Sequence, residues 1–355
     1  MLMFSMLRKR PGTLLISLLM GAASCAFSLH AQQASAPPTA QLDNGRIQAT
    51  VYLPDAKNGF YKGTRFDWAG IIGKLTAGGH TYYDRWFTAI DPSVNDYVWQ
   101  GHQIIAGPDS SATGVPEEFT ADDNLGYTIA PVGGTFIKIG VGVLRKPAEP
   151  SYDKYAHYEI VDGGKRTVKA TKTSIAFTQD LIDTSTGYGY LYTKTIRLIP
   201  NTSQMVLEHT LKNTGTKAIH ARVYDHNFLT LDHQLSGPEF TVTTRFPITP
   251  KQPINAEFGS VEGNVIRYNR VLEDKEIFRV DMGGYGNTAS DYDFLIQNKK
   301  LDASVRIQGD RPLDRAALWS INAALSVEPF IALSIEPGQQ TDWKYTYTFG
   351  PARKP

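Results

Sequence analysis

The chain has 355 residues, 41% of them hydrophobic, and a formal net charge of +1. This is enough apolar sequence for a sizeable core, and a charge so close to zero argues against a nucleic-acid partner that is held by charge. Cysteine occurs once, at Cys25, so neither a disulfide framework nor a thiolate metal site can form in the rest of the chain.

The first 31 residues are typical of an export signal. A basic segment, Arg8–Arg10, precedes a short apolar run, Thr13–Ala23, and small residues then offer cleavage sites after Ala26 and Ala31. The apolar run is too short to span a membrane. We therefore expect no membrane span and a periplasmic or secreted protein. The alternative to plain cleavage is a lipid anchor on Cys25, which follows a weak lipoprotein-type sequence.

The rest of the chain predicts a short linker followed by one domain. Residues 32–43 begin with a stretch of Gln, Ala, Ser and Pro, and we expect a disordered linker there. From residue 44 to about 350, alternating apolar and polar residues with frequent turn residues predict an all-β domain of many antiparallel strands. The clearest strands are expected at residues 46–53, 136–144, 188–198, 205–211, 219–228 and 344–349. The best helix candidate is Leu313–Ile321, directly after Pro312.

Two places in the first part of the domain predict sugar contacts. Residues 61–70 interleave charged with aromatic side chains, and Arg65, Asp67 and Trp68 are the expected substrate-binding residues. Aromatic rings stack on the apolar face of a pyranose, while planar Arg and carboxylate groups bind its hydroxyls. The alternative is a surface pair of Arg65 and Asp67 beside a core tryptophan. Glu118, in a loop before a strand, is a further candidate, although most acids in loops are simply solvated.

The expected strand at 219–228 has the densest pattern of polar groups in the chain. One face is apolar, and the other face carries His220, Arg222, Tyr224, His226 and Phe228. Such a strand predicts one wall of a polar cleft, with Arg222 and Tyr224 among the groups that bind a polyol. A solvated sheet face is the alternative.

A second candidate lies near the C-terminus, where Glu328 interrupts the apolar run Leu325–Ile335. Burial of an unpaired carboxylate is costly, so an acid in such a run is usually partnered or functional. Pro329 is expected to stop regular strand pairing directly after it, as at an edge or a bulge. The sequence Glu336-Pro337-Gly338, by contrast, is typical of a turn between strands, which makes Glu328 the better functional candidate.

These two regions together resemble the aldose 1-epimerase (galactose mutarotase-like) family. Leu211–Gly215 followed by Tyr224–Leu229 is similar to the turn and the histidine-bearing strand of that family. The segments 327–329, 336–338 and 343–349 are similar to its C-terminal end, with a glutamate, a Pro-Gly turn and an aromatic last strand. Asn227-Phe228 stands where the family has Tyr-Phe, and the family's N-terminal Asn-Gly loop is not found.

The resemblance implies a β-supersandwich, with His226 as the catalytic acid and Glu328 as the catalytic base, and neither a metal nor another cofactor. Mutarotation needs a proton delivered to the ring oxygen of a sugar and one removed from its anomeric hydroxyl. A histidine with a pKa near about 6.5 and a glutamate whose pKa is raised by burial suit these roles. We expect the two side chains to face each other across one cleft, several ångströms apart, with a sugar between them.

Three functions remain open at this point, and in all of them the partner is a carbohydrate. The first is an anomer-interconverting isomerase, and the second is another carbohydrate-active enzyme on the same fold, such as a lyase. The third is a non-catalytic saccharide-binding module, which would depend more on the aromatic residues around Trp68 and Trp86. A metal site formed by His226, Asp232 and His233 is a further alternative, but we expect none, because such a pattern is common without a metal.

Overall fold

The computed structural model describes residues 36–120 and 124–352 of the chain. The predicted export signal, with Cys25, and the first part of the predicted linker lie outside these ranges. Within them the only helical elements are two 3-10 turns, η1 (Leu231–His233) and η2 (Ala289–Asp291). No helix of the described part is long and apolar enough to cross a membrane. The prediction of an all-β domain is confirmed.

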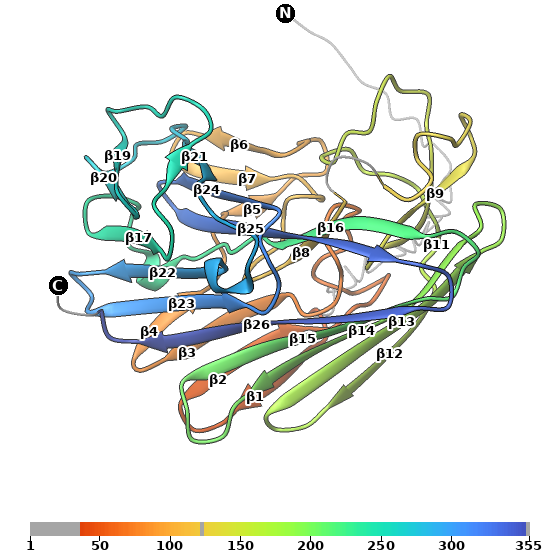
Figure 1. Ribbon diagram of the computed structural model, residues 1–355, viewed down its shortest axis with the longest axis horizontal. Helices are drawn as coiled ribbons and strands as arrows, with labels where there is room; N and C mark the ends of the chain where they lie inside the picture. Colours follow the sequence, from red (N-terminus) through yellow and green to blue (C-terminus); the bar gives the residue numbers. More distant parts are fainter. Residues whose placement is uncertain (1–35, 121–123, 353–355) are drawn as a thin grey trace, which may run out of the picture. The chain divides into compact units, whose positions relative to one another are not determined.

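The largest element is a ten-stranded antiparallel sheet (Figure 1). Its strands, in spatial order, are β12 (Lys165–Ala170), β13 (Ser174–Asp183), β14 (Tyr188–Leu198), β15 (Gln204–Asn213), β26 (Gln340–Gly350), β23 (Ala303–Gly309), β22 (Asp293–Asn298), β17 (Phe240–Thr244), β20 (Val265–Tyr268) and β19 (Gly259–Glu262).

A six-stranded antiparallel sheet carries the residues of the candidate site. Its strands, in spatial order, are β18 (Thr249–Pro250), β21 (Phe278–Gly283), β24 (Arg315–Ile321), β25 (Ala324–Ile335), β16 (Ile219–Asp225) and β8 (Glu117–Phe119). β16 and β25 are far apart in the sequence but are hydrogen-bonded neighbours, and Figure 1 shows them side by side.

Three smaller sheets complete the described part of the domain. One contains β1 (Thr39–Asp43), β2 (Ile47–Tyr52), β3 (Ile72–Ala77) and β4 (His80–Tyr83). The second contains β11 (Ile160–Asp162), β10 (Gly142–Arg145) and β9 (Thr135–Lys138). The third contains β5 (Ala89–Ile90), β7 (Gln103–Ala106) and β6 (Tyr97–Gln100).

Alternation along the strands explains how the two large sheets pack. On β14, every second residue from Tyr190 to Leu198 is buried, while the residues between them are more exposed. On β16, Ile219 and Val223 point to the same core as the β14 side chains. Full burial of a large apolar side chain stabilises the fold by about 1.5–3 kcal/mol. The large sheets therefore form the layers of a β-sandwich around one apolar core, as the sequence resemblance predicts.

Three predicted segments differ from the structure. Residues 39–43, expected to be disordered, form β1 and pair with β2. The expected strand at 136–144 is the β9–β10 hairpin, because the backbone turns at Gly140, which has φ +82°. The expected helix at 313–321 is wrong: strand β24 lies there, paired on one side with β21 and on the other with β25. Pairing on both sides outweighs the intrinsic helix preference of that sequence.

Candidate active site

The register of β16 and β25 places His226 opposite Glu328. The regular ladder ends at Tyr224↔Phe330, and an isolated bridge further along, at Leu229, resumes it in the same register. Between these points the antiparallel geometry puts His226 and Glu328 at a non-hydrogen-bonded position, where facing side chains are closest. The local strand geometry, rather than a distant contact, therefore brings the two predicted catalytic residues together.

Pro329 is the reason why the ladder is interrupted. It has no N–H to donate toward β16. On the other side of β16 the chain continues the pairing with the β8 segment, because the N–H of His226 donates to the carbonyl of Pro116 at 2.9 Å. On the other side of β25, pairing with β24 continues through Pro329 to Phe330. The expectation that regular pairing stops directly after Pro329 is therefore wrong, because residues 330–335 pair with β16, and the ladder to β16 is interrupted at Pro329 and the residues before it.

His226 and Glu328 are both buried and in close contact. Nε2 of His226 lies 3.4 Å from Oε1 of Glu328, and the two side chains are 6% and 8% exposed. The expected separation of several ångströms is therefore wrong, and no sugar ring fits between them. The cavity that they line has a volume of about 50 Å³, far below the roughly 300–1,000 Å³ of typical ligand pockets. A sugar can enter only if the side chains that cover the cavity move.

Aromatic rings fix the orientation of His226. Its ring stacks on Phe228 with centroids 3.9 Å apart, and the rings of Trp319 and Phe66 meet it edge-on at 5.4 and 5.8 Å. Its Nδ1 atom is buried and accepts or donates no hydrogen bond within the described ranges. Among the described residues, Nε2 is therefore the ring nitrogen of His226 that has a protein partner, and this partner is Glu328.

Arg65, Tyr224 and Glu118 form a buried network beside the catalytic pair. Nε of Arg65 donates to Oε2 of Glu118 at 2.9 Å, and the Tyr224 hydroxyl donates to the same oxygen at 2.6 Å. Nζ of Lys138 lies 3.6 Å from the other oxygen of Glu118. Arg65 and Tyr224 line the same cavity as the pair, whereas Glu118 does not. Glu118 thus orients two residues of the cavity instead of facing it.

Burial and positive charge shift the pKa values of both candidate catalytic groups. Burial raises the pKa of Glu328 to about 7, although Arg279, Lys154 and Arg65 act in the opposite direction. Burial, followed by the positive charges of Arg65, Lys154 and Arg279, holds the pKa of His226 well below its ordinary value of 6.5. Near neutral pH the imidazole is therefore neutral, and the proton that the pair can carry lies on Glu328.

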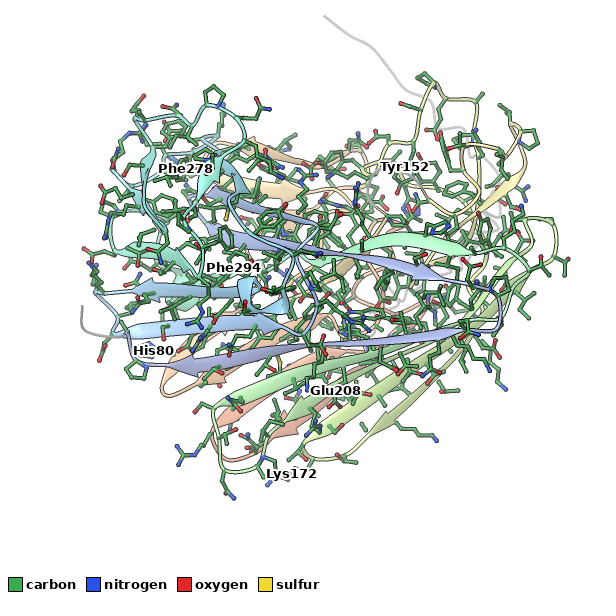
Figure 2. The ribbon with its side chains drawn as sticks, viewed as in Figure 1. His80, Tyr152, Lys172, Glu208, Phe278 and Phe294 are labelled. Atoms are coloured by element: carbon green, nitrogen blue, oxygen red, sulfur yellow. The ribbon has the colours of Figure 1, made fainter. Side chains whose placement is uncertain are left out.

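A segment that the sequence did not point to covers the cavity. The covering segment, residues 146–159, joins β10 to β11, and its Lys154 and Tyr155 line the cavity. The Tyr155 ring lies over the Arg65 guanidinium at 4.9 Å. Tyr152, labelled in Figure 2, stacks on Tyr158 with centroids 5.4 Å apart. The Tyr155 contact thus packs the segment against the cavity wall, while the stacking of Tyr152 on Tyr158 holds the segment together.

Sequence reasoning also missed several other lining residues. Arg279 on β21, Asp96 and Trp319 line the cavity, together with Trp86, which the sequence suggested only for a binding module. Trp319 is missed because the local sequence of its strand favours a helix. The one sequence signal for the covering segment is the alternation of tyrosines with charged residues at 152–158, the same kind of pattern as at residues 61–70.

Besides Glu118, three predicted substrate-binding residues do not line this cavity. Arg222 is half exposed, and its Nε lies 2.6 Å from a carboxylate oxygen of Asp314. Asp67 is buried and accepts the N–H of Ala69 at 2.8 Å, and burial raises its pKa to about 6. Trp68 lies in a different place, described next. Arg222 is outside the cavity because it lies in the part of β16 where this face of the strand is exposed, whereas the face is buried further along, from Tyr224.

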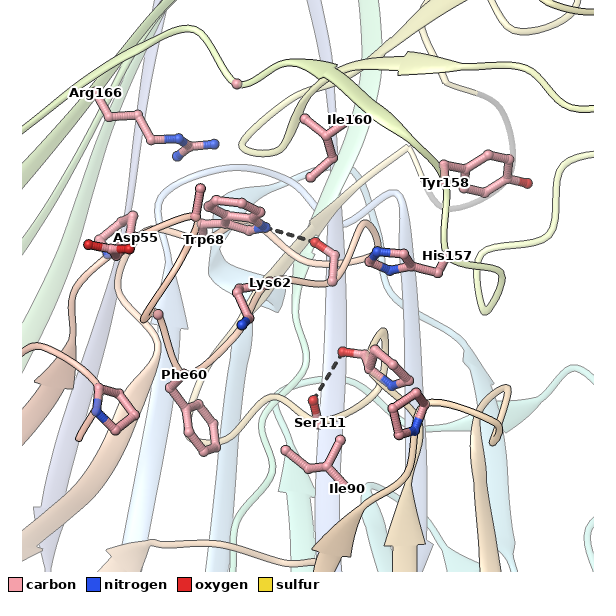
Figure 3. A pocket seen from close by; sticks show the side chains of 18 of the residues that line it. Asp55, Phe60, Lys62, Trp68, Ile90, Ser111, His157, Tyr158, Ile160 and Arg166 are labelled. Carbon is pink, nitrogen blue, oxygen red and sulfur yellow. Dashed lines mark hydrogen bonds between the residues drawn. The ribbon is translucent and has the colours of Figure 1, made fainter. Parts of the chain in front are cut away.

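Trp68 lines a second, larger cavity of about 1050 Å³ (Figure 3). Its indole N–H donates to the carbonyl of Gly63 at 2.7 Å, and the guanidinium of Arg166 covers the ring at 5.0 Å. His157 and Tyr158 of the covering segment line this larger cavity, whereas Lys154 and Tyr155 of the same segment line the cavity of His226. Arg166 therefore covers one face of the Trp68 ring, and the side chain as a whole is buried, so the ring is not open to a sugar.

The alternative metal site is not assembled. Asp232 lies 2.7 Å from Nδ1 of His80 and accepts the N–H of Thr81, while His233 lies 3.7 Å from Asp84. Across residues 36–120 and 124–352, no group of three His, Cys, Asp or Glu side chains is arranged to hold a metal ion. His226, Asp232 and His233 therefore do not form a metal site together.

Comparison with known proteins supports the fold. No protein-family model and no curated protein sequence matches the chain. Among solved structures it is similar to a putative aldose 1-epimerase from Escherichia coli K12, with a TM-score of 0.51 and 11% identity over 89% of this chain and 99% of the other. A GalM/aldose epimerase homologue from C. elegans gives a TM-score of 0.52 and 12% identity over 90% of this chain and 100% of the other.

A third similar structure is the Slr1438 protein from Synechocystis sp. PCC 6803, with a TM-score of 0.51 and 13% identity over 90% of this chain and 98% of the other. At these identities the likeness concerns the arrangement of strands and not the chemistry. The comparisons therefore show that this chain has the galactose mutarotase-like fold of aldose 1-epimerase-type structures.

Proposed function

We propose that this protein is a carbohydrate-active isomerase of the aldose 1-epimerase type, which interconverts the anomers of a sugar or saccharide end by acid–base ring opening. The observation that carries the proposal is the buried pair of His226 and Glu328, 3.4 Å apart, with the pKa values of both groups shifted. Converging acid–base groups with perturbed pKa values are typical of active sites. A module that only binds saccharide has no need of such a pair.

The close spacing suits the two oxygens that react. The ring oxygen and the anomeric oxygen of a sugar are bonded to the same carbon, so they lie next to each other. A donor and an acceptor on one wall can therefore reach both oxygens from one side, without a sugar between them. The ring then opens, the C1–C2 bond rotates, and the ring closes on the other face.

The proton that starts this reaction lies on Glu328 in the free protein, because the pKa of His226 is the lower of the two. In that form Glu328 can donate to the ring oxygen while His226 accepts from the anomeric hydroxyl. The opposite roles, implied by the family resemblance, need the proton to cross to His226 when the sugar binds. Both versions use a single proton and no cofactor.

The test is to replace each residue and follow anomer exchange by NMR. His226→Asn and Glu328→Gln should each lower turnover by about 10²–10⁴-fold, which is the usual contribution of a general acid or base. The double variant should lose less than the product of the two single losses, because the pair acts as a unit. Arg222→Gln, an exposed residue on the same strand, is the matched control. Full exchange activity of both single variants would contradict the roles given to His226 and Glu328, and a lack of exchange by the unaltered protein would contradict the isomerase itself.

A lyase acting on acidic sugars is the second candidate, and the three cations around the pair favour it. In such an elimination a base removes the proton on the carbon next to the sugar carboxylate, and the glycosidic oxygen leaves and takes up a proton. The negative charge that builds up on the carboxylate must then be offset by nearby positive groups. Arg65, Lys154 and Arg279 lie where they could offset it. A lyase gives an unsaturated product that absorbs ultraviolet light, whereas an isomerase does not. Absorbance during incubation with acidic oligosaccharides separates the two functions.

We further propose that the protein is exported and acts in the periplasm or outside the cell. Support comes only from the sequence of the first 31 residues, with a basic segment, an apolar run and small residues before the cleavage sites. Mass spectrometry of the protein isolated from cell fractions should find an N-terminus after Ala26 or Ala31, or a lipidated Cys25. An intact N-terminus on cytoplasmic protein would contradict export.

A further inference from the structure

Three cations from separate parts of the chain converge on the cavity of His226 and Glu328. Arg65 comes from the loop before β3, Lys154 from the covering segment, and Arg279 from β21. Each of them is close enough to influence the charge of both members of the pair. Positive groups gathered around a small, poorly solvated space create a field that favours a bound anion.

The neighbouring acids do not cancel this positive charge. Glu118, which accepts from Arg65, is shared with a buried lysine, and Asp281 is shared between Arg279 and Arg315. Each of these two acids thus faces two cations. The cations around the site therefore outnumber the acids that lie behind its walls.

Lys154 is the cation with the least compensation. No salt bridge joins it to an acid in the part of the chain that the structure describes, and its Nζ lies over the Tyr155 ring at 5.2 Å. The acids on the cavity wall itself are Asp96, which lies 3.9 Å from Arg65, and Glu328, which with a pKa of about 7 is partly protonated near neutral pH. Lys154 therefore presents a half-buried charge that makes no salt bridge among the described residues, although Asp96 and Glu328 lie near enough to interact with it electrostatically.

The backbone around Lys154 is held by its own turn. The Asp153 carboxylate accepts the N–H of Tyr155 at 2.9 Å, and the Asp153 carbonyl accepts the N–H of Ala156 at 3.0 Å. The Tyr158 hydroxyl in turn accepts the N–H of Asp153 at 2.9 Å. The backbone on both sides of Lys154 is thus held by hydrogen bonds, and the residue lines the cavity.

We propose that the sugar bound in this cavity carries an acidic group, a carboxylate or a sulfate or phosphate ester, which Lys154 binds directly and which Arg65 and Arg279 attract. The inference rests on the proposed function, because it names the substrate class of the same site. Lysine binds such anions as a compact point charge, and the arginine donors that their own acids leave free add direction. A neutral sugar would cover Lys154 without supplying the charge that it lacks.

The experiment compares D-galacturonate and D-glucuronate with D-galactose and D-glucose as probes of the full chain. Binding is measured by calorimetry and anomer exchange by NMR, both at low and at high salt. The acidic sugars should bind at least about 10-fold more tightly at low salt, and salt should reduce this difference, because screening weakens the attraction. Galactose 6-phosphate and galactose 6-sulfate show which kind of anion fits.

A pair of variants assigns the effect to Lys154. Lys154→Met keeps most of the apolar stem of the side chain but removes its charge, and should weaken binding of the preferred acidic sugar by about 10-fold or more without weakening binding of the neutral sugars. Lys62→Met, in the larger cavity of Figure 3, is the control and should change neither.

The outcomes separate the inference from the proposed function. Equal binding of acidic and neutral sugars, with normal anomer exchange, would overturn the inference and leave the proposed function standing. Preferential binding of acidic sugars without exchange would support the inference and contradict the proposed function. Failure to bind any of the acidic probes, or an unchanged affinity in Lys154→Met, would overturn the inference.

Discussion

His226 and Glu328 lie so close together that they titrate as a pair. Since the pKa of Glu328 is about 7 and that of His226 is well below 6.5, the pair holds one proton between these two values. Acid–base catalysis needs this singly protonated form, whichever residue carries the proton. We therefore expect kcat/KM to fall above about pH 7, where the pair loses its proton, and to fall again in acid, where His226 gains a second one.

The measurement is the pH profile of anomer exchange between pH 4 and 9, with the uncatalysed exchange subtracted. Glu328→Gln provides the control, because its residual activity should lack the decline near about pH 7 that Glu328 causes. A profile of the unaltered protein that stays flat from neutral to alkaline pH would contradict the assignment of Glu328.

Glu118 is expected to matter for stability because it is the counter-charge of Arg65 and Lys138. All three side chains are buried. One oxygen of Glu118 accepts from Arg65, and the other lies 3.6 Å from Nζ of Lys138. Glu118→Gln leaves two buried cations without their acid, so the free energy of unfolding should fall by about 3–5 kcal/mol. Glu159→Gln, which breaks an exposed pair with Arg145, should cost less than about 1 kcal/mol. Urea denaturation measures both, and equal losses would contradict the role given to Glu118.

At the scale of elements, the β9–β10 hairpin shows where a sequence pattern fails. Residues 136–144 alternate like one strand, but Gly140 has φ +82° and a Cβ atom there would lie 2.6 Å from the Cβ of Asp67. The alternation therefore comes from two strands joined by a turn that only glycine fits. Asp67 stands out in the sequence by its charge, yet its structural position is beneath this turn.

Replacing Gly140 tests this explanation. Gly133 has φ +80°, and a Cβ atom added there would have no other atom within 4 Å, so Gly133→Ala should cost only the left-handed backbone strain, about 1–2 kcal/mol. Gly140→Ala has the same strain and in addition overlaps Asp67, so it should cost about 1–3 kcal/mol more. Thermal unfolding of the two variants gives the comparison, and a Gly140→Ala protein as stable as Gly133→Ala would show that the close approach to Asp67 is relieved cheaply.

Strand β24 illustrates the opposite limit. Its Ala, Leu and Trp residues favour a helix locally, and only pairing with β21 and β25 decides for a strand. Because Trp319 belongs to this strand, the wrong element also hid one wall of the cavity. A local pattern cannot reveal which strands become neighbours, and for a central strand the neighbours decide.

At the scale of the whole molecule, the sequence predicted the residues whose local setting is unusual. His226 and Tyr224 stood out by alternation and Glu328 by its place in an apolar run, and all three line one cavity. Lys154 and Arg279 have ordinary neighbours in the sequence, so only the folded chain shows that they reach the same place. The predictable part of the site is therefore its catalytic wall together with Arg65, and the unpredictable part is the pair of cations Lys154 and Arg279.

The buried acids of the domain also govern how its stability depends on pH. The pKa values of Glu117 and Glu118 are lowered to about 2, against the raising effect of burial, by His209 and Lys194 for the first and by Arg65 and Lys138 for the second. A carboxyl group whose pKa is lowered by folding contributes stability that is complete above its unfolded pKa, about 4.5, and is lost as the pH falls toward 2.

Glu328 and Asp67 act in the opposite direction, because burial raises their pKa values to about 7 and about 6. The folded state takes up these protons before the unfolded state does, so both groups add stability as the pH falls from about 7 toward about 4. His226 has the opposite effect over part of this range, because its pKa is lowered by folding and the folded state therefore loses stability as the pH falls. We expect the free energy of unfolding to rise slightly between pH 7 and 5 and to fall steeply below about pH 4. Urea denaturation at each pH from 3 to 8, monitored by tryptophan fluorescence, measures the free energy of unfolding. The Glu328→Gln variant should show a smaller rise between pH 7 and 5. A steady decline of the free energy of unfolding from pH 7 to 5 would contradict this expectation.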